Sequence, residues 1–238
     1  MEKISSSVII LFIITVVITV WLFFRSAKYP PMLIAVITIW IILQSALGLN
    51  GFYTEWNAVP PRFILLIAPA VVCIIILLLT KQGRQFADNL NIKTLTLLHV
   101  IRIPVEITLY YLSVAKLIPR SMTFEGSNFD IISGITAPLI YYFVFVAKKI
   151  SSKVFLMWNL LCLGLLLNVV ITAIFSAKTP FQQFAFDQPA IGIAYFPFVL
   201  LPGVIVPIVL FSHLVIIRKL LLDFRKKQSQ SGFAYSSR

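Results

Sequence analysis

The chain has 238 residues, of which 60% are hydrophobic and only 12% are charged, and its mean hydropathy is +0.98. This composition excludes a soluble globular domain and is typical of an integral membrane protein. The net charge of +12 would suit a nucleic-acid-binding protein, but no nucleic-acid-binding motif accompanies the cations, so we expect no nucleic-acid partner.

Seven apolar runs follow one another along the chain, and we expect each to be a membrane-spanning helix. At about 1.5 Å per residue, each can cross a hydrocarbon core of about 30 Å, the shorter ones with help from flanking residues. The runs cover residues 8–24, 32–49, 63–80, 95–117, 131–147, 154–175 and 192–217. The predicted fold is therefore an all-α polytopic bundle of seven transmembrane helices, with a transmembrane domain at 1–220 and a basic, polar cytoplasmic tail at 221–238.

The charges of the loops predict the orientation of the bundle. The loops after the first, third, fifth and seventh runs are basic, with Arg25, Lys28, Lys81, Arg84, Lys93, Lys148, Lys149, Lys153, Arg218, Lys219, Arg225, Lys226 and Lys227. The loops between them are poor in cations. Because basic loops stay in the cytoplasm, we expect the N-terminus outside and the C-terminus inside a bacterial-type inner membrane.

The fourth run carries ionisable groups within an apolar segment. At 100° per residue its polar side chains share one arc about 80° wide: His99, Arg102, Glu106, Tyr110 and Ser113. Charges at that depth cost about 2.5–3.5 kcal/mol each, so this stripe is expected to face a protein interior or a wet cavity. Arg102 and Glu106 are spaced for an i,i+4 ion pair, which either serves transport or binding or is a structural packing device.

Proline and histidine add two further expectations. Pro104 has no N–H for the carbonyl of Val100, which would need another partner. His99 and His213 are predicted at similar depth on different helices, where they either bind a haem or metal or form separate local hydrogen bonds. No supporting motif accompanies the two histidines, so we predict no cofactor.

The outer loops mix charged, amide and aromatic residues. One interpretation is a charged outer vestibule formed by Glu55, Trp56, Arg62, Arg120, Glu125, Asn128, Asp130 and Asp187. The other is an aromatic belt at the membrane interface, with Asp130 capping the fifth helix.

The seventh run contains Pro197, Pro202, Gly203 and Pro207. Prolines at this spacing predict a bent helix whose freed carbonyls need other partners. Such backbone is tolerated where it is buried in protein or lines a cavity, which favours a pocket over a solid bundle. Gln44 and Asn159, on other runs, could face the same interior or join helices by hydrogen bonds.

The segment Met122–Pro138, together with Arg102–Glu106 upstream, resembles a pattern found in uncharacterised bacterial inner-membrane proteins. The resemblance implies no activity; it implies that the fourth run, its outer loop and the fifth run work as one unit. No motif of a known hydrolase, phosphate-binding or retinal-binding protein is present.

Three functions are consistent with the sequence. The first is binding or transport of a small solute, an ion or a lipid through a polar interior centred on the fourth run. The second is an accessory membrane protein that docks a membrane-protein partner through its outer loops. The third is an intramembrane enzyme or haem protein.

Overall fold

The computed structural model describes residues 4–56 and 58–236, with side chains up to residue 228, and within these residues it contains helices and no strands. The α-helices are α1 (Ser6–Ser26), α2 (Pro31–Leu49), α3 (Ile64–Leu79), α4 (Lys81–Asn89), α5 (Ile92–Leu98), α6 (Arg102–Val114), α7 (Ile131–Tyr141), α8 (Ser152–Ser176) and α9 (Val206–Ser236). Short 3₁₀ turns lie at Phe52–Thr54, His99–Ile101, Arg120–Met122 and Gly192–Ala194. Single turns of π-helix lie at Tyr142–Val146 and Leu201–Ile205.

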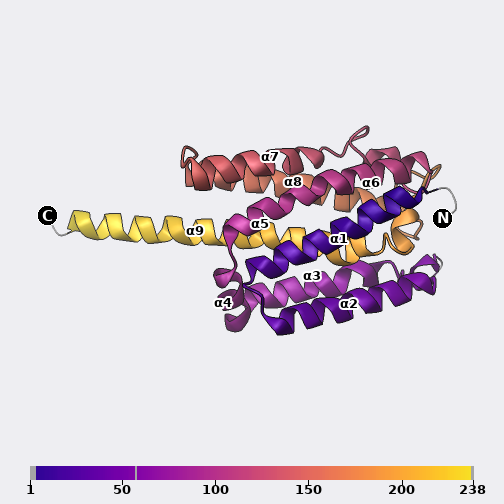
Figure 1. Ribbon diagram of the computed structural model, residues 1–238, viewed down its shortest axis with the longest axis horizontal. Coiled ribbons are helices and arrows are strands. Elements are labelled where there is room, and N and C mark those ends of the chain that lie inside the picture. The colour runs from indigo at the N-terminus through magenta and orange to yellow at the C-terminus, as the bar shows by residue number, and fades with distance from the viewer. Residues whose placement is uncertain (1–3, 57, 237–238) are drawn as a thin grey trace.

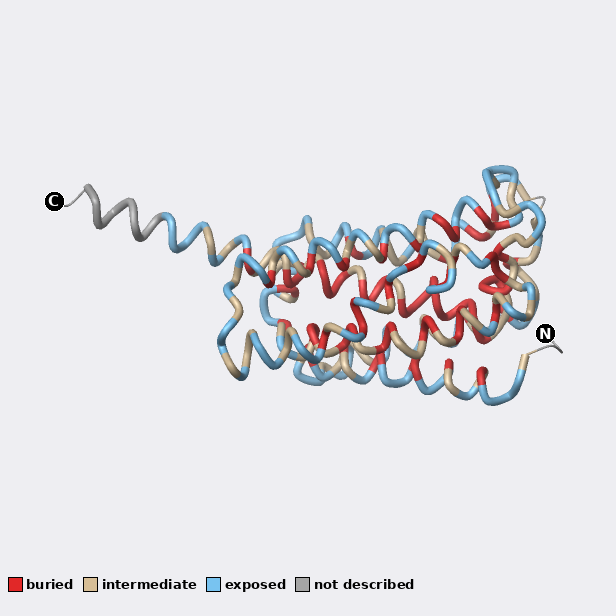
Figure 2. The backbone as a smooth tube through the Cα atoms, turned by 90° about the horizontal axis from the view of Figure 1, so that it is seen from above, coloured by how far each residue is buried: buried red, intermediate tan, exposed pale blue. Residues whose placement is uncertain are grey.

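The helices run along one common direction, with α9 in the middle of the bundle (Figure 1). Helices α7 and α8 lie on one side, α2 and α3 lie on the other, and α1 and α5–α6 lie between them. Most residues of 198–220 are buried, whereas α1, α2 and α8 expose a large part of their apolar surface. Buried residues accordingly face the centre of the bundle, and exposed ones form its outer faces (Figure 2).

Fewer helices reach membrane-spanning length than the sequence predicted. Among the described residues, five helical segments are long and apolar enough to cross a membrane: Ser6–Ser26, Pro31–Leu49, Ile92–Val114, Ser152–Ser176 and Leu201–Gln228. A sixth is added if α3 and α4, which are bent by 93°, count as one span. The prediction of seven is not met by this measure because the helix at Ile131–Val146 is only about 24 Å long at about 1.5 Å per residue.

The basic loops lie together at one end of the bundle. The α1–α2 turn, α4 and the α7–α8 loop are at the end from which α9 projects, and the loops poor in cations are at the opposite end (Figure 1). Helix α9 continues to Ser236, through most of the predicted polar tail at 221–238, and residues 237–238 lie outside the described part of the chain.

The fourth predicted span is not one regular helix. Helix α5 ends at Leu98, the 3₁₀ turn follows at His99–Ile101, and α6 begins at Arg102. Pro104 therefore lies in the first turn of α6, where a missing N–H costs no helical hydrogen bond, rather than inside a continuous helix.

Candidate functional site

Arg102 is the largest of the fully buried side chains, with 2% of its surface exposed. Its Nη1 forms an ion pair with Asp130 Oδ1 at 2.6 Å and also donates to the carbonyl of Cys162 at 3.2 Å. The predicted ion pair between Arg102 and Glu106 is thus wrong. The counter-ion of Arg102 is Asp130, at the start of α7 and 28 residues along the chain. Asp130 was expected in an outer vestibule or as a helix cap, but it is 4% exposed, and its side chain does not cap the backbone of α7.

Glu106 is bound by an amide instead of a cation. Asn128 Nδ2 donates to Glu106 Oε1 at 2.6 Å and to the carbonyl of Met122 at 3.0 Å, while Asn128 Oδ1 accepts from the backbone N–H of Asp130. Asn128 therefore contacts both the Glu106 carboxylate and the backbone of Asp130. Glu106 Oε2 and the Nε and Nη2 atoms of Arg102 are buried without a protein hydrogen-bond partner.

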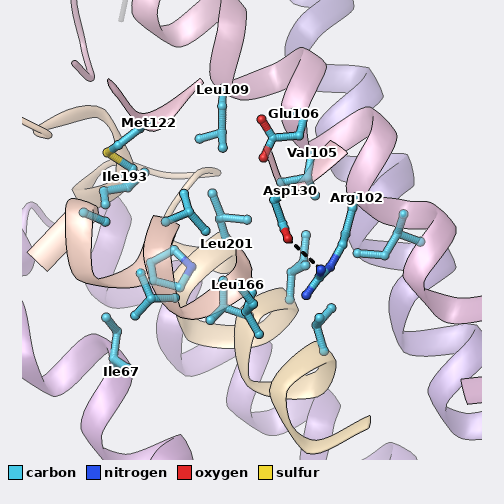
Figure 3. A pocket seen from close by; sticks show the side chains of 18 of the residues that line it. Ile67, Arg102, Val105, Glu106, Leu109, Met122, Asp130, Leu166, Ile193 and Leu201 are labelled. Atoms are coloured by element: carbon cyan, nitrogen blue, oxygen red, sulfur yellow. Dashed lines mark hydrogen bonds and ion pairs between the residues drawn. The ribbon is translucent and has the colours of Figure 1, made fainter. Parts of the chain in front are cut away.

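A small cavity adjoins these groups. Its volume is about 50 Å³, and Arg102, Glu106 and Asp130 are its charged lining residues (Figure 3). The rest of the wall is apolar and comes from α3, α6, α8 and the start of α9, with Pro202 of the irregular turn among the lining residues. A cavity of this size has room for a few waters.

Close packing of α7 against α6 brings the two segments together. A Cβ at Gly134 would lie 2.8 Å from Ile103 Cγ1 and 3.0 Å from the Ile103 nitrogen. The missing side chain at Gly134 therefore allows the start of α7, with Asp130, to approach Arg102.

Only part of the predicted stripe faces the cavity. Arg102 and Glu106 line it, whereas Tyr110 is half-buried and stacks on Phe124, and Ser113 is half-buried without a place in the lining. The 3₁₀ turn at His99–Ile101 advances about 120° per residue instead of about 100°, so His99 departs from the arc by several tens of degrees.

His99 and His213, which come from different helical segments, lie in direct contact. Their rings stack with centroids 3.9 Å apart and planes 15° apart, and Trp158 packs against His99. His213 Nδ1 is 3.1 Å from Asn159 Oδ1, while both ring nitrogens of His99 and Nε2 of His213 have no protein partner. Imidazole lone pairs lie in the ring plane, so two face-to-face rings do not converge on one iron or metal ion. Within the described residues, no three His, Cys, Asp or Glu side chains gather as a metal site.

The remaining vestibule candidates do not join this site. Arg120 and Glu125 form an exposed ion pair at 3.4 Å, and Arg62 stacks over Phe52. Glu55 and Asp187 are exposed, and Trp56 is half-buried. None of these residues lines the cavity of Figure 3.

Residues 60–221 match one family model, described as a domain of unknown function (DUF8737). The chain belongs to the DUF8737 family. The match contains all of the groups described above, from His99 to His213, and excludes α1 and α2. No curated protein and no solved structure matches the chain. The family description assigns no activity, so the chemistry of this DUF8737 site rests on its own geometry.

Proposed function

We propose that this chain is a membrane protein that binds a proton or a small cation at Glu106 and carries it across the membrane. The observation that supports the proposal is the imbalance of charge around the cavity: one guanidinium, Arg102, faces two buried carboxylates, Glu106 and Asp130. Asp130 takes the ion pair, which leaves Glu106 with a single amide donor and one free oxygen. A buried carboxylate without its own cation is neutralised by a proton or by a bound cation.

The size of the cavity favours an ion over a larger solute. A volume of about 50 Å³ accommodates a few waters or one cation with part of its hydration, but not a sugar, an amino acid or a lipid. The location of the charged residues supports a cavity deep in the membrane, since Arg102 and Glu106 lie near the middle of the candidate span Ile92–Val114. Ionisable groups at such depth are typical of ion and proton pathways.

We also propose seven spans, with α3 and α7 crossing alongside the five longer segments. Helix α7 runs beside α8 in Figure 1, and Lys148 and Lys149 come shortly after the π turn that continues it. Exposed apolar side chains on α1, α2 and α8 support contact with lipid, for example Val17 (61%), Ile39 (66%) and Leu161 (65%). By the positive-inside rule, the end from which α9 projects is cytoplasmic and the N-terminus is outside, in an inner-membrane arrangement.

The experiment compares Glu106→Gln with the unaltered chain in sealed proteoliposomes. Gln keeps the shape of Glu106 and can still accept the Asn128 amide through its own oxygen, but it cannot ionise. We expect flux of protons, or of Na⁺ or K⁺, in the unaltered chain and loss of that flux in the variant. Glu125→Gln, at an exposed ion pair, is the control and should transport normally.

Two outcomes would overturn the proposal. The first is Glu106→Gln flux equal to that of the unaltered chain. The second is the absence of proton, Na⁺ and K⁺ flux in folded, reconstituted protein. In either case the Arg102–Asp130 pair is a packing device, and the accessory role predicted from the sequence becomes the better explanation.

A further inference from the structure

A second and larger cavity lies beneath helix α2, on the opposite side of the bundle from α7 and α8. Its volume is about 460 Å³, within the range of about 300–1,000 Å³ that is typical of ligand sites. The lining is almost wholly apolar and includes Val36 and Trp40 of α2, Ala70 and Leu77 of α3, and Phe211 of α9. Val36 is 54% exposed, so the cavity is a groove that opens onto the outer face of the bundle.

Helix α2 is buried most deeply in its last turns. Its buried residues are Gln44 and Gly48, both in its last turns, and none lies between Pro31 and Leu43. Gln44 Oε1 accepts the Tyr53 hydroxyl at 2.7 Å, and Trp40 Nε1 donates to the Gly203 carbonyl at 2.8 Å. The first turns of α2 therefore cover the groove, and their half-buried side chains Leu33, Ile34 and Ile37 pack against the core.

The groove ends beside the basic end of the molecule. Two of its lining aromatics, Phe23 near the end of α1 and Phe86 of α4, are at this end. Lys28 lies in the α1–α2 turn and Lys81 begins α4, and both are exposed. In Figure 1 this turn and α4 are at the same end of the bundle. A ligand in the groove would thus have an apolar body and an anionic head.

We propose that the groove binds one acyl chain of an anionic phospholipid, with the phosphate held by Lys28 and Lys81. This rests on the membrane placement proposed above but not on the ion pathway. The lining of α2 extends from Leu33 to Leu43, about 15 Å at about 1.5 Å per residue. That length is half of a hydrocarbon core of about 30 Å, which is the depth of one leaflet. A lipid of the cytoplasmic leaflet fits both the depth and the charge.

The first test uses the indole of Trp40 as a reporter within the groove. A variant with Trp21, Trp56 and Trp158 replaced by Phe is reconstituted into vesicles of phosphatidylcholine that contain a minor fraction of lipid brominated on the acyl chain. We expect brominated phosphatidylglycerol to quench Trp40 more strongly than brominated phosphatidylcholine at the same fraction. The double variant Lys28→Gln with Lys81→Gln should weaken this preference roughly tenfold to thirtyfold, because that is the affinity that two cations contribute near an anionic membrane surface. Lys148→Gln with Lys149→Gln is the matched control and should leave it unchanged.

The second test fills the groove in the full chain with all four tryptophans. Ala70→Phe places a ring in the lining, whereas Ala35→Phe adds the same ring on an exposed position of α2 outside it. Native mass spectrometry after detergent extraction should show phosphatidylglycerol retained by the unaltered chain and by Ala35→Phe, and lost from Ala70→Phe.

Equal quenching by both lipids would mean that only bulk lipid touches Trp40 and would overturn the proposal, as would equal lipid retention by the two Phe variants. A change in oligomeric mass confined to Ala70→Phe would instead identify the groove as a protein interface. A negative result in the ion-flux experiment would not affect these lipid measurements, so the two proposals can fail separately.

Discussion

The charge imbalance around the cavity makes an asymmetric prediction for the two members of its ion pair. Arg102→Met leaves two buried carboxylates, Glu106 and Asp130, without any cation. Breaking a buried pair in this way costs about 3–5 kcal/mol of unfolding free energy. Asp130→Asn is milder, since Arg102 keeps Glu106 as a nearby counter-charge and the new amide oxygen can still accept from Nη1. We expect a cost of about 1–3 kcal/mol for that variant.

The measurement is denaturant or thermal unfolding of the purified variants in mixed micelles, followed by circular dichroism. For a chain of this size the Arg102→Met cost corresponds to a fall in melting temperature of roughly 6–20 °C. Adding Glu106→Gln to Arg102→Met removes one of the uncompensated charges, so the double variant should be more stable than Arg102→Met alone. Equal destabilisation by Arg102→Met and Asp130→Asn, or no recovery in the double variant, would refute the assignment of one cation to two carboxylates.

Two further predictions concern packing and pH. Gly134→Ala would place a Cβ 2.8 Å from a side chain of α6 and should destabilise the bundle by about 1–3 kcal/mol. Gly164→Ala meets nothing within 4 Å and should stabilise α8 by up to about 1 kcal/mol. Thermal melts compare the two variants, and a similar loss of stability in both would contradict the packing argument. Burial raises the pKa of the Tyr53 phenol, against the opposing effect of its hydrogen bond to Gln44, so the unfolded chain releases this proton first and stability should fall as the pH rises above about 10. Tyr53→Phe should flatten that alkaline fall, and an unchanged slope would show that Tyr53 does not cause it.

The positions of the helices could be predicted from the sequence because they depend on local patterns. The apolar run at 154–175 became α8, Ser152–Ser176, and the run at 32–49 became α2, Pro31–Leu49. The alternation of basic and cation-poor loops predicted that the basic loops would lie together at one end, and they do, because successive apolar segments run in opposite directions. The 3₁₀ turn at His99–Ile101 was not predictable, because nothing in the local composition distinguishes it from a continuous helix.

The ion pair illustrates a different limit. Arg102 and Glu106 stand four residues apart, and local geometry alone favours their pairing. The actual partner, Asp130, follows a polar loop and therefore resembled a surface residue. Its burial depends on how closely α7 packs on α6, which is a tertiary property. The sequence signal that could have pointed to this partner is the pair Asn128 and Asp130, two residues apart and directly before an apolar run.

The seventh run shows how a local rule and a tertiary contact combine. Pro207 has no N–H, so the carbonyl four residues earlier, at Gly203, loses its helical donor. The sequence therefore predicts which acceptor is free but not which group replaces the donor. In the structure the replacement is the Trp40 indole, which donates to Gly203 from α2 at 2.8 Å. The irregular backbone at Leu201–Ile205 thus contributes to both cavities, since Pro202 lines the charged one and Gly203 lines the apolar groove beneath α2. A shift in this one turn would therefore move residues that line both cavities.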